Sequence, residues 1–112
     1  MFTMMNNARL NVGVQGVQVA EAATQAAAAY ARDRIQGARD GKAAAIVEHA
    51  DVRRMLLRMK AQTMAARALV YYACGHVDRA NLGDAKARER LEMMTPLAKA
   101  HATDLGLSLI HI

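Results

Sequence analysis

Apolar and small residues recur at intervals of three and four along most of the chain, the spacing that keeps one face of an α-helix apolar. Three stretches show this pattern: residues 3–36, about 50–76, and from about 84 onward. Gly37 directly follows the first stretch and suits a helix C-terminus, because glycine readily adopts the left-handed conformation found there. In the second stretch the apolar positions run from Met55 to Val70, with arginine and lysine between them. The pattern predicts an all-α protein, an antiparallel helical bundle of three to four helices.

Breaks in the pattern predict the connections and the domain boundary. Residues 37–49 contain two glycines, mixed charges and no clear period, so we expect a loop there. Pro96 lacks an amide donor and should kink or divide the third helix, with Thr95 capping the new start. The helical pattern ends near Gly106. We therefore predict one helical domain over residues 1–106 and a tail over residues 107–112, to which the pattern assigns no role.

One stripe on the first helix combines small residues with an arginine at each end. Its members alternate at spacings of four and three: Arg9, Gly13, Gly16, Ala20, Ala23, Ala27, Tyr30 and Arg34. The small middle lets another helix approach the backbone closely, and we expect it to pack on the Met55 to Leu69 face of the second helix. Arg9 and Arg34 should lie about 37 Å apart. Solvated arginines at helix ends are common, so the spacing alone leaves that interpretation open.

Composition and charge narrow the classes of protein. A chain of 112 residues has room for one domain, and its single cysteine, Cys74, excludes an internal disulfide. The net charge of +5 suits an anionic partner. The basic run DVRRMLLRMK has no interleaved aromatic residues, so we expect no nucleic-acid binding. We also expect no membrane span and no signal peptide, and therefore a cytoplasmic protein.

The titratable residues do not predict a metal site. The histidines share no i, i+4 spacing with one another or with cysteine: His49, His76, His101 and His111. Such a spacing is what places two ligands on one helix face. Cys74 is interpreted as a small core residue, and Glu48 with His49 as a charged junction before the second helix.

Three segments in order resemble a known family: NARLNVGVQGVQVAEAATQAAAAYARDRIQG, IVEHADVRRMLLRMKAQTMAARALVYYA and MTPLAKAHATDLG. Together they are similar to the first part of the C-terminal helical domain of acyl-CoA dehydrogenases, over residues 1 to about 106. Within that family the likeness is strongest to the longer bacterial members related to 3-methylmercaptopropionyl-CoA dehydrogenase. The resemblance rests on the helix end YARDRIQ, the helix start EHADVRRML and the run TPLAKAHATD, taken together.

The resemblance implies roles for a few residues. In the family, the arginine at the place of Arg34 reaches across a subunit interface to the diphosphate of a neighbour's FAD, and the residue at the place of Gln36 assists there. Arginine suits this role because its planar fork can give phosphate two hydrogen bonds. The arginine at the place of Arg9 lies on the acyl-CoA side and would bind substrate. Some members carry their catalytic glutamate at the place of Ala8, which cannot take a proton, so no catalytic residue is assigned here.

The resemblance also implies an activity and partners for a larger parent protein. That parent would be an FAD-dependent acyl-CoA dehydrogenase, a homo-oligomer that passes electrons to an electron-transfer acceptor. The glycine-rich flavin segment and the usual glutamate base of the family do not appear in this chain, so we expect it to be inactive alone. The alternative is a stand-alone helical interaction module without catalysis, whose small-residue stripe packs on a partner helix.

Overall fold

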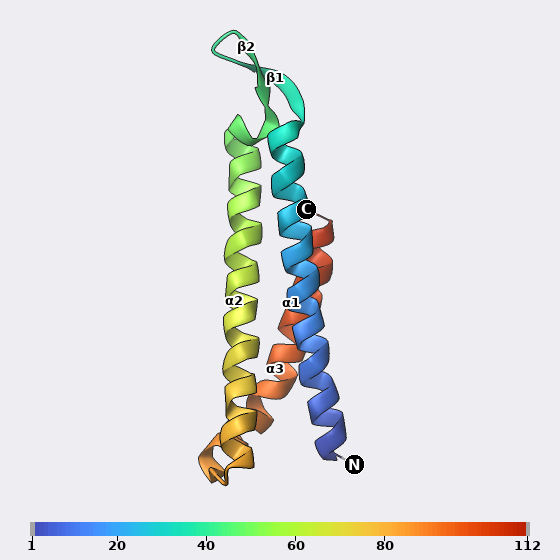
Figure 1. Cartoon of the computed structure of the whole chain (residues 1–112), viewed down its shortest axis with the longest axis vertical. Coiled ribbons are helices and arrows are strands. Elements are labelled where there is room, and N and C mark those ends of the chain that lie inside the picture. The colour runs from blue at the N-terminus through green and yellow to red at the C-terminus, as the bar shows by residue number, and fades with distance from the viewer. Residues whose placement is uncertain (1, 112) are drawn as a thin grey trace.

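The computed structural model describes residues 2–111 of the chain, with side chains from residue 4 onward, and contains three long helices and one short hairpin. The elements are α1 (Phe2–Asp33), β1 (Ile35–Arg39), β2 (Lys42–Ala45), a 3-10 turn (Ile46–Glu48), α2 (Ala50–Asn81) and α3 (Ala85–Ile110). The molecule is a rod of 64 × 21 × 16 Å. The predicted all-α bundle is confirmed, with three helices and a two-stranded hairpin added at one end (Figure 1).

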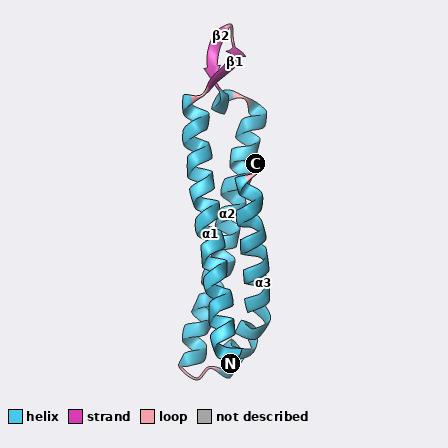
Figure 2. Ribbon diagram, turned by 90° about the vertical axis from the view of Figure 1, so that its right-hand side faces the viewer, coloured by secondary structure: helices cyan, strands magenta, loops and turns pink. Residues whose placement is uncertain are grey.

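The helices run up, down and up along the rod. α1 leads to the hairpin at one end of the bundle, α2 returns beside it, and α3 packs against both (Figures 1 and 2). α2 extends to Asn81, five residues beyond the predicted end near His76. The additional residues bury Ala80, which is 6% exposed, and this explains why the helix continues.

The core lies where small residues let the helices come close. The buried residues of α1 include Leu10, Val17 and Ala20; those of α2 include Met59, Ala66, Val70 and Ala73; those of α3 include Ala98, Ala102, Leu105 and Leu109. A Cβ added to Gly16 would lie 2.6 Å from the carbonyl carbon of Ala102, so the two backbones are in contact. Gly13 lies between Ala98 of α3 and Val70 of α2.

At Gly16 this packing corrects the expected partner of the α1 stripe, whereas Gly13 lies between α2 and α3. Gly16 meets α3, not the Met55 to Leu69 face of α2. The physical reason is that α3 carries its own small residues at four-residue spacing, Ala98, Ala102 and Gly106. Two helix faces that both carry small residues can approach more closely than a small-residue face and a face that carries methionine and leucine side chains.

Pro96 neither divides α3 nor starts a new helix. The helix is continuous from Ala85 to Ile110, and the Thr95 hydroxyl donates to the carbonyl oxygen of Leu91 at 2.7 Å instead of capping a new start. Proline removes one backbone donor, but its φ is helical. The buried face of α3 continues on both sides of the proline, from Met94 to Ala98, so tertiary packing maintains the helix.

The C-terminal end of α3 also differs from the prediction. Gly106 lies inside the helix, which continues to Ile110, and Leu109 is buried at 1% exposure. The predicted helix end near Gly106 is therefore wrong. The separate assignment of residues 107–112 to a tail outside the domain stays a prediction.

The segment predicted as a loop contains a hairpin. Arg39 pairs with Lys42, and the two residues between them, Asp40 and Gly41, have φ values of 54° and 77°. Two consecutive residues with positive φ form the tight turn whose twist matches that of two antiparallel strands. The hairpin then leads through a 3-10 turn into α2, which begins at Ala50.

Candidate cofactor-binding hairpin

The hairpin, with the residue that precedes it, carries both side chains predicted to bind the cofactor. α1 ends at Asp33, three residues earlier than predicted, so Arg34 lies between helix and strand and Gln36 lies in β1. The prediction that both belong to the helix end is therefore wrong. The chain leaves the helix because the next residues pair with Lys42–Ala45 as a strand, which supplies hydrogen bonds that the helix no longer provides.

The backbone of Arg34 is fixed while its side chain is exposed. Its amide donates to the carbonyl oxygen of Tyr30 at 2.9 Å, and its own carbonyl accepts from the Ile46 amide at 2.8 Å. The three ion pairs within residues 4–111 involve other arginines. The backbone of Arg34 is therefore fixed, and its exposed guanidinium keeps its donors available to an external anion.

A β-bulge lies immediately after Arg34. Ile35 pairs with Ala45 and Ala38 with Ala43, so two residues of β1, Gln36 and Gly37, face only Ala44 on β2. Gly37 has a φ of 77°, a left-handed conformation that glycine adopts without a steric penalty. Ala44 is buried at 3% exposure. All five residues of β1 are exposed, so the Gln36 side chain is accessible to solvent.

Two side chains tie the hairpin to the start of α2. The His49 Nε2 lies 2.7 Å from the carbonyl oxygen of Gln36, and the Arg39 Nη1 donates to the carbonyl oxygen of Glu48 at 3.0 Å. His49 occupies the cap position of α2 with an extended backbone, but its side chain makes no capping hydrogen bond. The sequence interpretation of Glu48 and His49 as a plain charged junction missed this connection.

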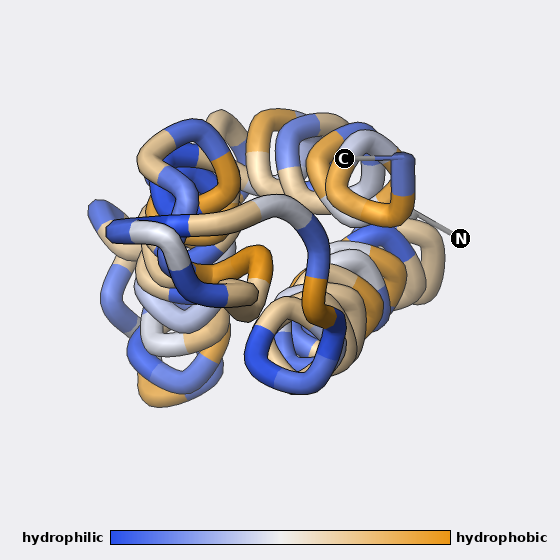
Figure 3. Tube along the Cα trace, turned by 90° about the horizontal axis from the view of Figure 1, so that it is seen from above, coloured by the Kyte–Doolittle hydropathy of each residue, from blue (hydrophilic) through white to orange (hydrophobic). Residues whose placement is uncertain are grey.

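The surface around the hairpin is basic. Four cationic residues, Arg32, Arg34, Arg39 and Lys42, outnumber the two acidic ones between residues 32 and 42. Figure 3 shows the hairpin crossing over the end of the bundle, with hydrophilic residues at its turn. An exposed arginine fork is suited to phosphate because it can donate two parallel hydrogen bonds, and the neighbouring amide side chain can add another. The residues present therefore fit the diphosphate portion of a dinucleotide.

Arg9, the predicted substrate residue, lies near the opposite end of α1. It is exposed, and it shares this end of the bundle with an open groove of about 480 Å³. The groove is lined by Asn6, Asn7 and Leu10 of α1, by Val77 and Ala80 of α2, and by Leu91 and Thr95 of α3, among others. Arg9 itself does not line the groove. The structure does not bring Arg9 and Arg34 together, and a single copy cannot join them in one site.

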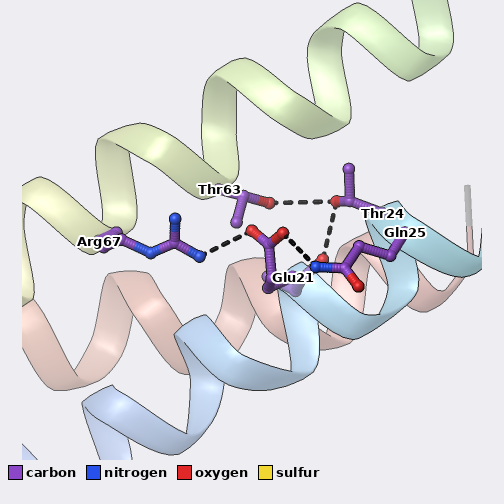
Figure 4. Close-up of polar contacts among 6 residues, drawn as sticks. Glu21, Thr24, Gln25, Thr63 and Arg67 are labelled. Atoms are coloured by element: carbon purple, nitrogen blue, oxygen red, sulfur yellow. Dashed lines mark hydrogen bonds and ion pairs between the residues drawn. The ribbon is translucent and has the colours of Figure 1, made fainter. Parts of the chain in front are cut away.

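A polar cluster links α1 and α2 in the middle of the bundle (Figure 4). Arg67 donates to Glu21 at 2.7 Å, and Gln25 donates to the other carboxylate oxygen at 2.8 Å. The Thr24 and Thr63 hydroxyls lie 3.3 Å apart. The hydrogen bond from Gln25 and then that from Arg67 lower the pKa of Glu21 below its ordinary value. The cluster links α1 to α2 within the bundle, and none of its hydrogen bonds involves a hairpin residue.

The remaining titratable candidates lie apart from the hairpin. Burial, and secondarily the charge of Asp78, raise the pKa of the Cys74 thiol, which suits a partly buried packing residue better than a nucleophile. His76 is 3% exposed, and its Nδ1 lies 2.9 Å from the carbonyl oxygen of Tyr72. Within the described residues, three or more His, Cys, Asp or Glu side chains never gather in a group able to hold a metal ion. Among residues 2–111 no helix combines the length and apolar character needed to cross a membrane.

Comparison with known proteins identifies the class. The family described as "Acyl-CoA dehydrogenase, C-terminal domain" matches residues 1–111. The 3-methylmercaptopropionyl-CoA dehydrogenase of Ruegeria pomeroyi is 48% identical over 112 residues, covering 93% of this chain and 19% of that protein. A butyryl-CoA dehydrogenase of Syntrophomonas wolfei is 37% identical over 115 residues, covering 95% of this chain and 19% of that protein. The search of solved structures found no significant match.

The chain belongs to the acyl-CoA dehydrogenase family and corresponds to its C-terminal domain, as the three segments of the sequence predicted. It spans about a fifth of the length of the curated relatives it matches.

Proposed function

We propose that the chain is a piece of an FAD-dependent acyl-CoA dehydrogenase, in which it supplies subunit-interface helices and one part of the FAD diphosphate site. The parent enzyme would remove hydrogens from the α and β carbons of an acyl-CoA thioester. FAD, when bound, would accept the β-hydrogen as hydride. The chain contributes binding and orientation to that reaction, and it is not active alone.

The observation that carries the proposal is the fixed backbone and free side chain of Arg34. Its amide and carbonyl are both hydrogen-bonded within the chain, yet its guanidinium is exposed beside the basic hairpin. Gln36 is exposed two residues further along. In this proposal Arg34 pairs with the diphosphate of FAD, which a neighbouring subunit holds, and Gln36 adds a hydrogen bond.

Arg9 is proposed to contact the acyl-CoA substrate. It is exposed near the end of the rod remote from the hairpin, so it would serve a different place in the assembly from Arg34. The parent is proposed to be a cytoplasmic homo-oligomer that uses an electron-transfer acceptor. Two separated binding residues on one rod suit an oligomer, because each end can meet a different neighbour.

The test replaces Arg34 by alanine or lysine in a complete enzyme. The segment is placed in the full-length Ruegeria pomeroyi relative, in place of its matching region. Loss of a charged hydrogen-bonded contact costs about 1.5–3 kcal/mol, so Arg34→Ala should weaken FAD binding about 10- to 150-fold. The FAD affinity of Arg34→Lys should lie between those of the unsubstituted chimera and Arg34→Ala, because lysine keeps the charge and loses the planar fork.

The matched control is Arg58→Ala, an exposed arginine on α2 away from the hairpin. It removes the same charge and should leave the FAD dissociation constant unchanged. Thermal unfolding of the apo-proteins verifies that all variants are folded. Equal FAD dissociation constants for the unsubstituted chimera and Arg34→Ala would overturn the proposed role.

The isolated chain gives a second test. Purified alone, it should retain no stoichiometric FAD and show no dehydrogenase activity. A yellow protein that bleaches on addition of acyl-CoA would overturn the statement that the piece is inactive.

One observation favours the alternative, a helical interaction module. α2 carries a second apolar stripe of exposed residues: Leu57, Ala61, Met64, Ala68, Tyr71 and Gly75. Its spacing of four and three matches that of helices which pack side by side. The reading frame of the parent gene discriminates the two functions. A glycine-rich flavin segment and a glutamate base encoded beyond this chain support the enzyme, and a stop codon after Ile112 supports the module.

A further inference from the structure

His49 makes the only side-chain hydrogen bond to the bulge within the described residues. Its Nε2 lies 2.7 Å from the carbonyl oxygen of Gln36. A carbonyl oxygen only accepts, so the His49 Nε2 carries a hydrogen and donates it. The ring nitrogen that faces the carbonyl is therefore the donor of this hydrogen bond.

The imidazole also packs against the second residue of the bulge. A Cβ built on Gly37 would lie 3.3 Å from both Cε1 and Nε2 of the ring. Gly37 is thus constrained twice, by its φ of 77° and by the ring beside it. The ring holds the carbonyl before Gly37 and covers the space where a side chain would project.

His49 is itself firmly attached to α2. Its amide donates to the carbonyl oxygen of Ile46 at 3.1 Å, and its carbonyl accepts from the Arg53 amide at 3.0 Å, within the first turn of the helix. His49 is a half-buried residue, whereas Arg39 and Glu48, which form the other connection, are both exposed. His49 therefore connects the bulge to the rigid start of a long helix.

We propose that His49 is a positioning residue for the cofactor site, which fixes the Gln36–Gly37 bulge and so directs Arg34 and Gln36 toward the bound diphosphate. This inference rests on the proposed function. The carbonyl of Arg34 accepts from the Ile46 amide, and the carbonyl of Gln36 accepts from the His49 ring. These two hydrogen bonds fix the backbone on both sides of Ile35. Without the ring, the glycine-containing bulge would be free to move, and a diphosphate would have to order it on binding.

The experiment compares His49→Leu with His49→Gln. Glutamine can place a side-chain N–H close to where the histidine Nε2 donates, whereas leucine fills similar space without a donor. In the chimera, His49→Leu should weaken FAD binding about 2- to 10-fold, the effect of one lost neutral hydrogen bond. His49→Gln should recover most of that loss. The control is His101→Leu, an exposed histidine on α3, which should leave FAD binding unchanged.

The 112-residue chain provides a readout that does not depend on FAD. Amide hydrogen exchange, measured by NMR, should be faster at Ile46 in His49→Leu than in the unsubstituted chain, and His49→Gln should restore the protection. Amides in the middle of α1 and α3 should exchange equally in all three proteins. Equal protection of Ile46 in the leucine variant would overturn the inference.

The Arg34 variants separate the two proposals. If Arg34→Ala weakens FAD binding and His49→Leu does not, the positioning role is wrong and the proposed function stands. If Arg34→Ala has no effect, the proposed function is wrong. If leucine and glutamine at position 49 weaken binding equally, donation by Nε2 is not what positions the site. In the Arg34→Ala background, His49→Leu should lose most of its effect, because contacts that act as a unit are not additive.

Discussion

The backbones of Gly16 in α1 and Gly106 in α3 are in direct contact. A Cβ built on Gly106 would lie 2.8 Å from the carbonyl oxygen of Gly16 and 3.3 Å from its Cα. A Cβ on Gly16 would in turn lie 2.9 Å from the backbone nitrogen of Thr103. The spacing between the two helices at this point is set by the absence of side chains on both.

Gly16→Ala should therefore destabilise the bundle. The added methyl meets backbone atoms, which cannot move aside as a flexible side chain would, and we expect a loss of about 1–3 kcal/mol in the free energy of unfolding. Urea denaturation followed by circular dichroism measures the change. An unchanged midpoint would show that the helices do not touch here.

Gly75→Ala is the matched control within the same fold. Gly75 lies inside α2, is exposed, and a Cβ there would have nothing within 4 Å. Alanine should stabilise the helix by about 0.5–1 kcal/mol, because glycine loses more conformational freedom on folding. The two identical substitutions should thus shift stability in opposite directions.

The small-residue stripe shows what the sequence could and could not predict. The spacing of its small residues predicts a helix and the close approach of a second helix, because the period of the pattern depends on the sequence alone. The partner helix could not be read from the stripe, since α3 presents a comparable set of small residues at Ala98, Ala102 and Gly106. The prediction that Pro96 kinks or divides the third helix is wrong, because tertiary burial on both sides of the proline outweighs the loss of one backbone donor.

The sequence of the hairpin contains a turn signal without a matching strand signal. Asp40 followed by Gly41 is a strong two-residue turn signal, but the flanking strands are mostly alanine and charged residues without apolar alternation. The family resemblance points to Arg34 and Gln36, which lie immediately before β1 and within it. The His49 contact with Gln36 spans 13 residues and depends on the path of the hairpin, so no local pattern could have revealed it.

The pH dependence of stability should include a contribution from Glu21. Its pKa is lower in the folded chain than the ordinary value of 4.5, so its carboxylate stabilises the fold at higher pH. That contribution should decline as the pH falls from about 4.5 through the folded-state pKa. Glu21→Gln should be less stable than the unsubstituted chain at neutral pH, with a difference that shrinks toward acid.

Two further variants assign the cause of the Glu21 effect. Arg67→Gln removes the ion pair and should abolish only part of the pH dependence, because the hydrogen bond from Gln25 remains. Gln25→Ala should abolish a larger part, since that bond is the leading cause of the lowered pKa. Urea titrations at a series of pH values measure both. Parallel curves for Glu21→Gln and the unsubstituted chain would contradict the argument.

Cys74 should react slowly with an alkylating reagent. Burial raises the pKa of its thiol, so less of it is the reactive thiolate at a given pH. At pH 8, iodoacetamide should modify the native chain several-fold more slowly than the same chain in urea. Asp78→Asn should accelerate the native reaction modestly, because Asp78 is the lesser cause of the shift. A native rate equal to the unfolded rate would show an open thiol.

The isolated chain should form an antiparallel dimer through the exposed stripe of α2, centred on Met64. Leu57, Met64 and Tyr71 are 70%, 58% and 61% exposed, and they recur every seven residues on the helix face opposite the core. Basic residues lie within one turn of Leu57: Arg53, Arg54, Arg58 and Lys60. A parallel pair would bring these two clusters together, whereas an antiparallel pair places each cluster near Tyr71 of the other copy, where an arginine can lie over the ring.

Sedimentation equilibrium of the purified chain should detect this dimer at micromolar concentration. Each copy carries a net charge of +5, so the association should strengthen as salt screens the repulsion. Met64→Lys should give a monomer, because the two-fold axis would bring two cations together in an apolar contact. Leu82→Lys is the matched control: Leu82 is 88% exposed between α2 and α3, outside the stripe, and this variant should remain a dimer. A monomeric unsubstituted chain, or equal association of the two lysine variants, would mean that the α2 stripe is not the surface through which the copies meet.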